Sequence, residues 1–171
     1  MQLAAFTFFL LLLPVSSTEV TPPDDWERVG AAELKVLWFK VYKAELFTAT
    51  GVYDQPEMPL LLQLTYQRDI SKADLIDETE EQLKPFAPGE KVSAWLIQLD
   101  QIWPEIRQGD QFSFWVDEQG KGSFFHNQRW IGTLAAPEFS YAFINIWLSE
   151  QSNYPELAKK LRGDSRDETI K

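Results

Sequence analysis

Apolar and polar residues alternate in several short segments of the chain, and this alternation predicts β-strands. In residues 60–68 every second side chain from Leu60 through Tyr66 is apolar, and Arg68 falls on the same face. Residues 111–117 alternate in the same way, as a half-buried strand does. Residues 123–127 and 130–134 are separated by two residues and predict the arms of a short hairpin.

Residues 33–50 are rich in β-favouring residues, but both of their faces are partly apolar. This pattern predicts either one long strand that is bent or bulged near Leu37–Trp38, or two separate strands. In either reading, parity places Tyr42 on a largely apolar face together with Trp38 and Leu46. The two aromatic side chains are therefore expected to share an inner surface.

A different period predicts four helices. Ser71, followed three positions later by Asp74, is a helix-capping pattern, and Leu75, Ile76, Thr79 and Leu83 form the buried stripe that follows. In residues 92–103 apolar residues recur at offsets typical of an amphipathic helix. Residues 138–148 are apolar nearly all round and predict a deeply buried helix, and a short helix starts at Pro155.

The resulting order is strand, strand, two helices, three strands and two helices. It favours the α+β class, with an antiparallel sheet that carries helices packed on one face. The length of 171 residues fits one domain of ordinary size. We expect this domain to span residues 18–163, and we expect the charged residues 164–171 to form a disordered tail.

The first 17 residues predict a cleaved signal peptide. Leu3 to Val15 is apolar but too short to span a bilayer, which needs about 20 residues. The small residues Val15-Ser16-Ser17 that follow suit signal peptidase, although no Lys or Arg precedes the apolar stretch. A membrane anchor or a buried core segment is the alternative. After cleavage we expect an exported protein, periplasmic and monomeric, with no integral membrane segment.

Composition excludes several classes of partner and chemistry. The net charge of −10 disfavours nucleic acid as a partner and repels anionic membrane surfaces. The chain has no Cys and one His, so neither disulfides nor an ordinary metal site are expected. No nucleophile elbow, dinucleotide fingerprint or phosphate loop is present, and no cofactor is predicted. A structural role for His126, hydrogen-bonded within its hairpin, is favoured over a role as a general base.

Three stretches, taken in order, are similar to the chalcone isomerase superfamily, and most of all to its exported bacterial branch. The first is Lys40-Val41-Tyr42-Lys43-Ala44-Glu45-Leu46-Phe47, and the second is Leu64-Thr65-Tyr66-Gln67-Arg68-Asp69-Ile70. The third runs from Ile106 to Leu161 and includes Gly109-Asp110, Phe125-x-Asn127 and Ile146-Trp147-Leu148. The resemblance implies an open-faced β-sandwich with a ligand cleft between sheet and helices.

In that family the plant isomerases close a flavanone ring with a cationic Arg, a Thr, a Tyr and an Asn, whereas other branches bind fatty acids in the same cleft. By the resemblance, Tyr42 stands where the isomerases have the Thr, and their Arg falls at Gly30, with Arg28 two residues away. Residues 71–103 contain no convincing match for the catalytic Tyr and Asn. The resemblance therefore implies binding rather than chalcone isomerisation.

Physical chemistry singles out Arg68 and Tyr42 as candidate ligand-binding residues. A guanidinium on an apolar face needs a partner or a route to water. Arg68 is thus either an anchor for a ligand carboxylate or a structural residue at the end of its strand. A buried Tyr42 hydroxyl orients a ligand or simply completes the core. Trp38, Tyr66 and Asn127 complete the set of expected ligand-binding residues.

Three functions remain open. The leading one is non-catalytic binding of a fatty acid or a similar apolar anion. The second is an isomerase or lyase acting on an enone-like substrate, with Tyr42 and Arg68 stabilising an oxyanion. The third is an envelope protein that uses the fold as a scaffold.

Overall fold

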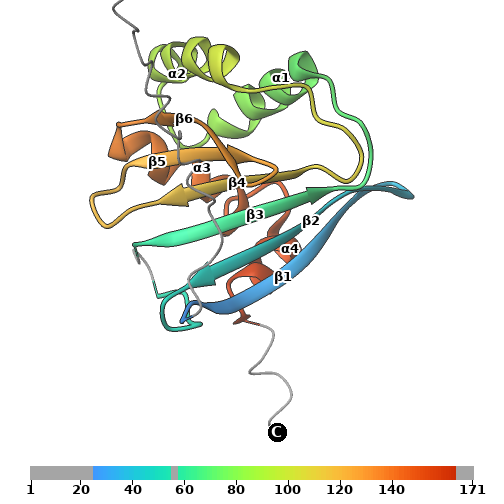
Figure 1. Cartoon of the computed structure of the whole chain (residues 1–171), viewed down its shortest axis with the longest axis vertical. Coiled ribbons are helices and arrows are strands. Elements are labelled where there is room, and N and C mark those ends of the chain that lie inside the picture. The colour runs from blue at the N-terminus through green and yellow to red at the C-terminus, as the bar shows by residue number, and fades with distance from the viewer. Residues whose placement is uncertain (1–24, 55–57, 165–171) are drawn as a thin grey trace, which may run out of the picture.

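The computed structural model describes residues 25–54 and 58–164, and within them six strands form one antiparallel sheet (Figure 1). Each strand pairs with the next along the chain, so the spatial order equals the sequence order. The α+β class is therefore confirmed. The strands are β1 (Glu27–Val36), β2 (Phe39–Thr48), β3 (Leu60–Tyr66), β4 (Gln111–Val116), β5 (Gly122–His126) and β6 (Arg129–Leu134).

Four helices pack on one face of this sheet (Figure 1). Gly30 on β1 and Gly132 on β6 show how close the approach is. A Cβ added at Gly30 would lie 2.2 Å from the carbonyl oxygen of Lys160, and one added at Gly132 would lie 2.4 Å from Ile102. The helices are α1 (Lys72–Leu83), α2 (Gly89–Ile102), α3 (Pro137–Leu148) and α4 (Pro155–Leu161).

The segment predicted as one bent strand or two is two strands, joined by a turn at Leu37–Trp38. Val36 pairs directly with Phe39 across this turn, and Leu37 adopts a φ of 56°. β1 also begins at Glu27, earlier than the pattern predicts. Its first half contains Gly30-Ala31-Ala32, which bury little side-chain area and therefore give no alternating signal.

The predicted start of α1 is confirmed in detail. The Ser71 hydroxyl oxygen accepts a hydrogen bond from the Asp74 backbone N–H at 3.1 Å, and the hydroxyl donates to the Asp74 carboxylate at 2.6 Å. This arrangement satisfies one of the amides that a helix start leaves without a partner. Leu83 and Thr79 are buried as expected, but Leu75 and Ile76 are only half-buried.

A dense aromatic core holds α2 and α3 against strands β4 and β5. The ring centroids of Phe114 and Phe124 lie 4.7 Å apart, and those of Phe114 and Phe143 lie 4.8 Å apart. The first pair is tilted and the second meets edge-to-face, and such contacts add to the hydrophobic gain from burying the rings. The core is thus solid beneath α3 at this side of the sheet. Its rings belong to Trp103, Phe112, Phe114, Phe124, Phe139 and Phe143.

The predicted signal peptide at 1–17 and all but the first residue of the predicted tail at 164–171 lie outside the described residues. Within the described residues, none of the helices has the length and apolar character needed to cross a bilayer.

Candidate functional site

A cavity of about 380 Å³ lies beneath α1, between that helix, α3 and the first four strands. Its volume falls within the range of about 300–1,000 Å³ typical of small-molecule sites. Sixteen of its 21 lining residues are aliphatic or aromatic, so most of its wall is apolar. They are Leu34, Val36, Val41, Tyr42, Leu62, Leu64, Tyr66, Ile70, Leu75, Trp103, Phe112, Phe114, Phe143, Ile146, Trp147 and Tyr154.

The cavity exists because α1 packs mainly on α2 and α3 rather than on a strand. The face of α1 that carries Leu75, Thr79 and Gln82 therefore borders the cavity instead of meeting the sheet. Leu75 is half-buried for this reason, although its position on the apolar stripe predicts full burial. The Thr79 hydroxyl donates a 2.7 Å hydrogen bond to the Leu75 carbonyl, so it adds little polarity to the wall.

Tyr42 lines the cavity, and its hydroxyl is held by a hydrogen bond from a residue of α3, 105 positions later in the chain. The indole N–H of Trp147 donates a 2.9 Å hydrogen bond to the Tyr42 hydroxyl oxygen. The Tyr42 ring also meets the Tyr66 ring edge-on at 5.7 Å. Burial, reinforced by the neighbouring Tyr66, raises the pKa of Tyr42 well above its ordinary value. The hydroxyl is therefore a neutral, oriented polar group.

Two further polar groups border the cavity without a protein partner. The indole N–H of Trp103 is buried and has no hydrogen-bond partner within the described residues. Tyr66 is 4% exposed, and its hydroxyl forms no hydrogen bond within those same residues. Burial raises the pKa of Tyr66, so this hydroxyl too is neutral. The unpaired N–H of Trp103 costs about 1–3 kcal/mol and is fully buried, so only the Tyr66 hydroxyl presents surface that a ligand could contact.

Three charged side chains stand among the lining residues. Arg68 lies just beyond the end of β3 and is exposed, while Asp74 and Glu78 are exposed on α1. No ion pair joins Arg68 to another described residue. The Glu78 carboxylate accepts a 2.6 Å hydrogen bond from the Gln82 side chain. An anionic ligand group would thus be attracted by Arg68 and opposed by the two carboxylates.

The structure brings Tyr42, Tyr66 and Arg68 together at this cavity but leaves Trp38 outside it. The prediction that Trp38 shares an inner face with Tyr42 and Leu46 is wrong, because Trp38 is 79% exposed in the β1–β2 turn. The alternation of inward and outward side chains holds only within a continuous strand, and the chain turns at Leu37–Trp38. Trp38 instead borders a shallow groove on the surface, which Arg68 also lines.

Asn127 does not reach the cavity either. It occupies the β5–β6 turn with a φ of 49°, and its side chain donates a 2.9 Å hydrogen bond to Asp110. His126 forms a second 2.8 Å hydrogen bond with the same carboxylate. Burial opposes ionisation of Asp110, yet the bonds from Asn127, the Arg107 amide and His126 lower its pKa to about 2. These hydrogen bonds hold the β5–β6 turn in place.

Within the described part of the chain, no cluster of His, Asp or Glu side chains is suited to a metal ion.

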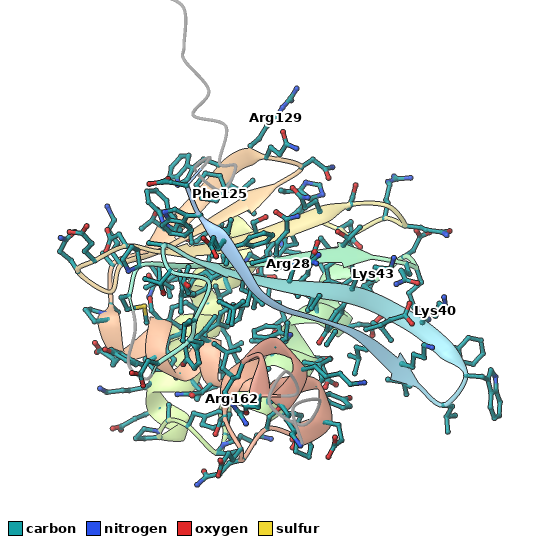
Figure 2. The ribbon with its side chains drawn as sticks, turned by 90° about the horizontal axis from the view of Figure 1, so that it is seen from below. Arg28, Lys40, Lys43, Phe125, Arg129 and Arg162 are labelled. Carbon is teal, nitrogen blue, oxygen red and sulfur yellow. The ribbon has the colours of Figure 1, made fainter. Side chains whose placement is uncertain are left out.

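Neither candidate position for the catalytic arginine lines the cavity, although Tyr42 does. Gly30 faces the carbonyl oxygens of Lys160 and Leu161, so no side chain fits there. Arg28 pairs with Glu45 at 2.8 Å and does not line the cavity (Figure 2).

Several lining residues were not predicted as site residues. Trp103, Phe143 and Trp147 lie on or next to helices that the pattern correctly predicts as buried. Periodicity indicates that such side chains face inward, but it does not separate a cavity wall from a filled core. Glu78 had a usable signal, since it follows Leu75 by three positions and therefore lies beside it on the helix.

The comparison with protein families decides the ancestry, because the profile of the family described as chalcone isomerase-like matches residues 29–163. The chain belongs to this chalcone isomerase-like family. A relative, an uncharacterized protein of Haemophilus influenzae, is 24% identical over 158 residues, which cover 92% of this chain and 78% of the relative.

The fold of this chalcone isomerase-like chain also resembles a solved structure. The crystal structure of a fatty-acid binding protein of Arabidopsis thaliana superposes with a TM-score of 0.64. The match covers 85% of this chain and 89% of the plant chain at 11% sequence identity. The predicted family and its open sheet with helices on one face are thereby confirmed.

Proposed function

We propose that this protein binds a fatty acid or a similar apolar anion in the cavity beneath α1 and does not catalyse its conversion. The observation that carries the proposal is the cavity itself. It combines about 380 Å³ of volume and a largely apolar wall with Arg68 among its lining residues. The solved relative of the same fold is a fatty-acid binding protein, which supports the same class of ligand.

The chemistry of the wall supports an elongated apolar ligand that carries one polar end. The aliphatic and aromatic side chains bury methylene groups, each of which contributes about 0.8 kcal/mol. A guanidinium such as Arg68 binds a carboxylate through two parallel hydrogen bonds. The hydroxyl of Tyr66 offers a further hydrogen-bonding group within the wall.

The isomerase alternative has less support. A side chain at Gly30 would collide with α4, and Arg28 is paired with Glu45. The hydroxyl of Tyr42 already accepts a hydrogen bond from Trp147. A purely structural role is also less well supported, because the space beneath α1 is not filled by side chains.

The test is a binding measurement with a matched pair of variants. Lipids that co-purify with the protein are identified by mass spectrometry, and a fluorescent fatty acid is then titrated into the delipidated protein. We expect saturable binding of one ligand per chain. Leu75→Trp narrows the cavity and should weaken binding, whereas Ile97→Trp, at an exposed position of α2, should leave it unchanged. No co-purified lipid and no saturable binding would refute the proposal.

We also propose that the protein acts outside the cytoplasm. The apolar residues 3–15 and the small residues that follow support this proposal. Cell fractionation followed by intact-mass analysis tests this proposal. A protein found in the periplasm with its N-terminus at residue 18 is the expected result. An intact N-terminus in the cytoplasmic fraction would contradict it.

A further inference from the structure

The tip of the β1–β2 hairpin exposes four consecutive apolar residues. Val36, Leu37, Trp38 and Phe39 are 45%, 77%, 79% and 54% exposed. The hairpin extends away from the helices and forms one end of the molecule (Figures 1 and 2). The other exposed large apolar side chains in the described residues, such as Ile97, Trp115 and Trp130, are not consecutive in the sequence. A cluster of this kind marks an interaction surface, whereas single exposed residues need no explanation.

This tip adjoins the cavity. Val36 lines both the tip and the cavity, and Arg68 lines both the cavity and the groove beside Trp38 and Phe39. A ligand that leaves the cavity past Arg68 therefore meets the apolar tip next. The arrangement places the exposed aromatic residues where an apolar ligand would enter.

The charge around the tip differs in sign from that of the whole chain. Lys35 and Lys40 flank the apolar residues and both pair with Glu33, at 3.0 and 3.4 Å. Arg68 lines the adjacent groove, and Lys43 lies opposite Glu33 in the strand register. Figure 2 shows Lys40 and Lys43 along the same hairpin. Residues 33–43 thus carry three cations and one anion, although the chain carries a net charge of −10.

We propose that the β1–β2 tip inserts into the interfacial region of a lipid bilayer that contains anionic lipids, and so places the cavity entrance at the membrane surface. Tryptophan is favoured at this interface because its ring is apolar and its N–H is polar. Lysines beside the inserted residues are attracted by anionic headgroups. Repulsion from the acidic remainder of the protein is screened beyond about 8 Å at physiological ionic strength.

The test uses the absence of cysteine in the chain, which makes an introduced thiol the only labelling site. Leu37→Cys and, as a control, Ile97→Cys are each labelled with an environment-sensitive fluorophore. Vesicles of phosphatidylcholine and phosphatidylglycerol are then added. We expect a blue shift and an intensity gain at residue 37 and no change at residue 97, and a weaker response with phosphatidylcholine alone.

A second variant measures how much the tip contributes to binding. Leu37→Asp adds a charge at a position whose φ of 56° aspartate tolerates, so the fold should be retained. We expect its partitioning into the anionic vesicles to fall by about tenfold relative to Ile97→Asp. An unchanged fluorophore at residue 37 would overturn the inference. So would a response without vesicles that grows with protein concentration, since the occupant would then be a second copy.

The membrane inference rests on the proposed binding function only to explain why the tip would lie at a membrane. Its test does not depend on fatty-acid binding. Leu37→Asp should take up a fluorescent fatty acid from vesicles more slowly than the wild type. Its equilibrium affinity for the same fatty acid in solution should be unchanged. Vesicle binding without fatty-acid binding would overturn the proposed function alone. Fatty-acid binding without insertion of residue 37 would overturn the membrane inference alone.

Discussion

The indole N–H of Trp147 on α3 donates a 2.9 Å hydrogen bond to the hydroxyl oxygen of Tyr42 on β2, across 105 positions of sequence. Both side chains are buried and both line the cavity. The bond therefore links the last long helix to the second strand and fixes the inner end of the proposed ligand site.

Removing both partners of this bond should cost less than the sum of the costs of removing each one alone. Trp147→Phe and Tyr42→Phe each leave one buried polar group without a partner, at a cost of about 1–3 kcal/mol in the free energy of unfolding. The double variant leaves neither group and should be less destabilised than the sum of the single variants. Urea unfolding of the four proteins measures the coupling, and strictly additive effects would show that the bond contributes nothing.

Affinity should rise with the length of the ligand chain until the cavity is full. Each added methylene that the wall buries should contribute about 0.8 kcal/mol, or about fourfold in Kd. Titration of saturated fatty acids of increasing length by calorimetry tests this. A plateau is expected where the chain exceeds the cavity, and an affinity independent of length would contradict burial in an apolar space.

The charged groups at the cavity should act with opposite signs on an anionic ligand. Arg68→Gln should weaken fatty-acid binding by about 1.5–5-fold, the range of an exposed ion pair. Glu78→Gln should strengthen binding because it removes a neighbouring negative charge. A fatty alcohol of equal length is the control ligand, and its affinity should respond to neither substitution. Equal losses for acid and alcohol would indicate a packing effect.

The network around Asp110 should make folding sensitive to acid. Its pKa is about 2 in the folded protein and lies near 4 in an unfolded chain. The carboxylate therefore contributes stability above about pH 4, and this contribution is lost as the pH falls toward 2. The free energy of unfolding of Asp110→Asn should fall less over this interval than that of the wild type. Parallel pH profiles would show that Asp110 does not carry the effect.

Two glycines provide a contrast in packing. A Cβ at Gly30 would lie 2.2 Å from a backbone oxygen of α4, so Gly30→Ala should cost about 1–3 kcal/mol or more. Gly89 starts α2 and has nothing within 4 Å of such a Cβ, so Gly89→Ala should be neutral or slightly stabilising. Thermal unfolding of both variants tests the contrast, and similar melting temperatures would contradict the tight β1–α4 contact.

The sequence pattern predicts most of the fold because alternating and helical periods report local burial. The capping pair Ser71–Asp74 and the hairpin turn at Asn127 are local features, and local chemistry decides them. Trp38 was misplaced because parity is lost wherever a strand is interrupted. The start of β1 was missed because Gly30 and its alanine neighbours carry no apolar pattern.

The candidate site is harder to predict, because a cavity forms where the side chains of neighbouring elements leave space between them. Leu75 and Trp147 each follow an ordinary helical pattern, and nothing local tells whether their side chains meet. Arg68 and Tyr66 were found because polar groups stand out on an apolar face. Trp103 was not predicted as a site residue, because the missing partner of its indole N–H can be recognised only in the folded structure.

The wall of the cavity draws on residues from Leu34 to Tyr154, which is nearly the full span of the described chain. A growing polypeptide consequently cannot enclose a guest until α3 and the residues after it have emerged and docked. The proposed ligand is therefore acquired by the folded protein rather than incorporated during synthesis.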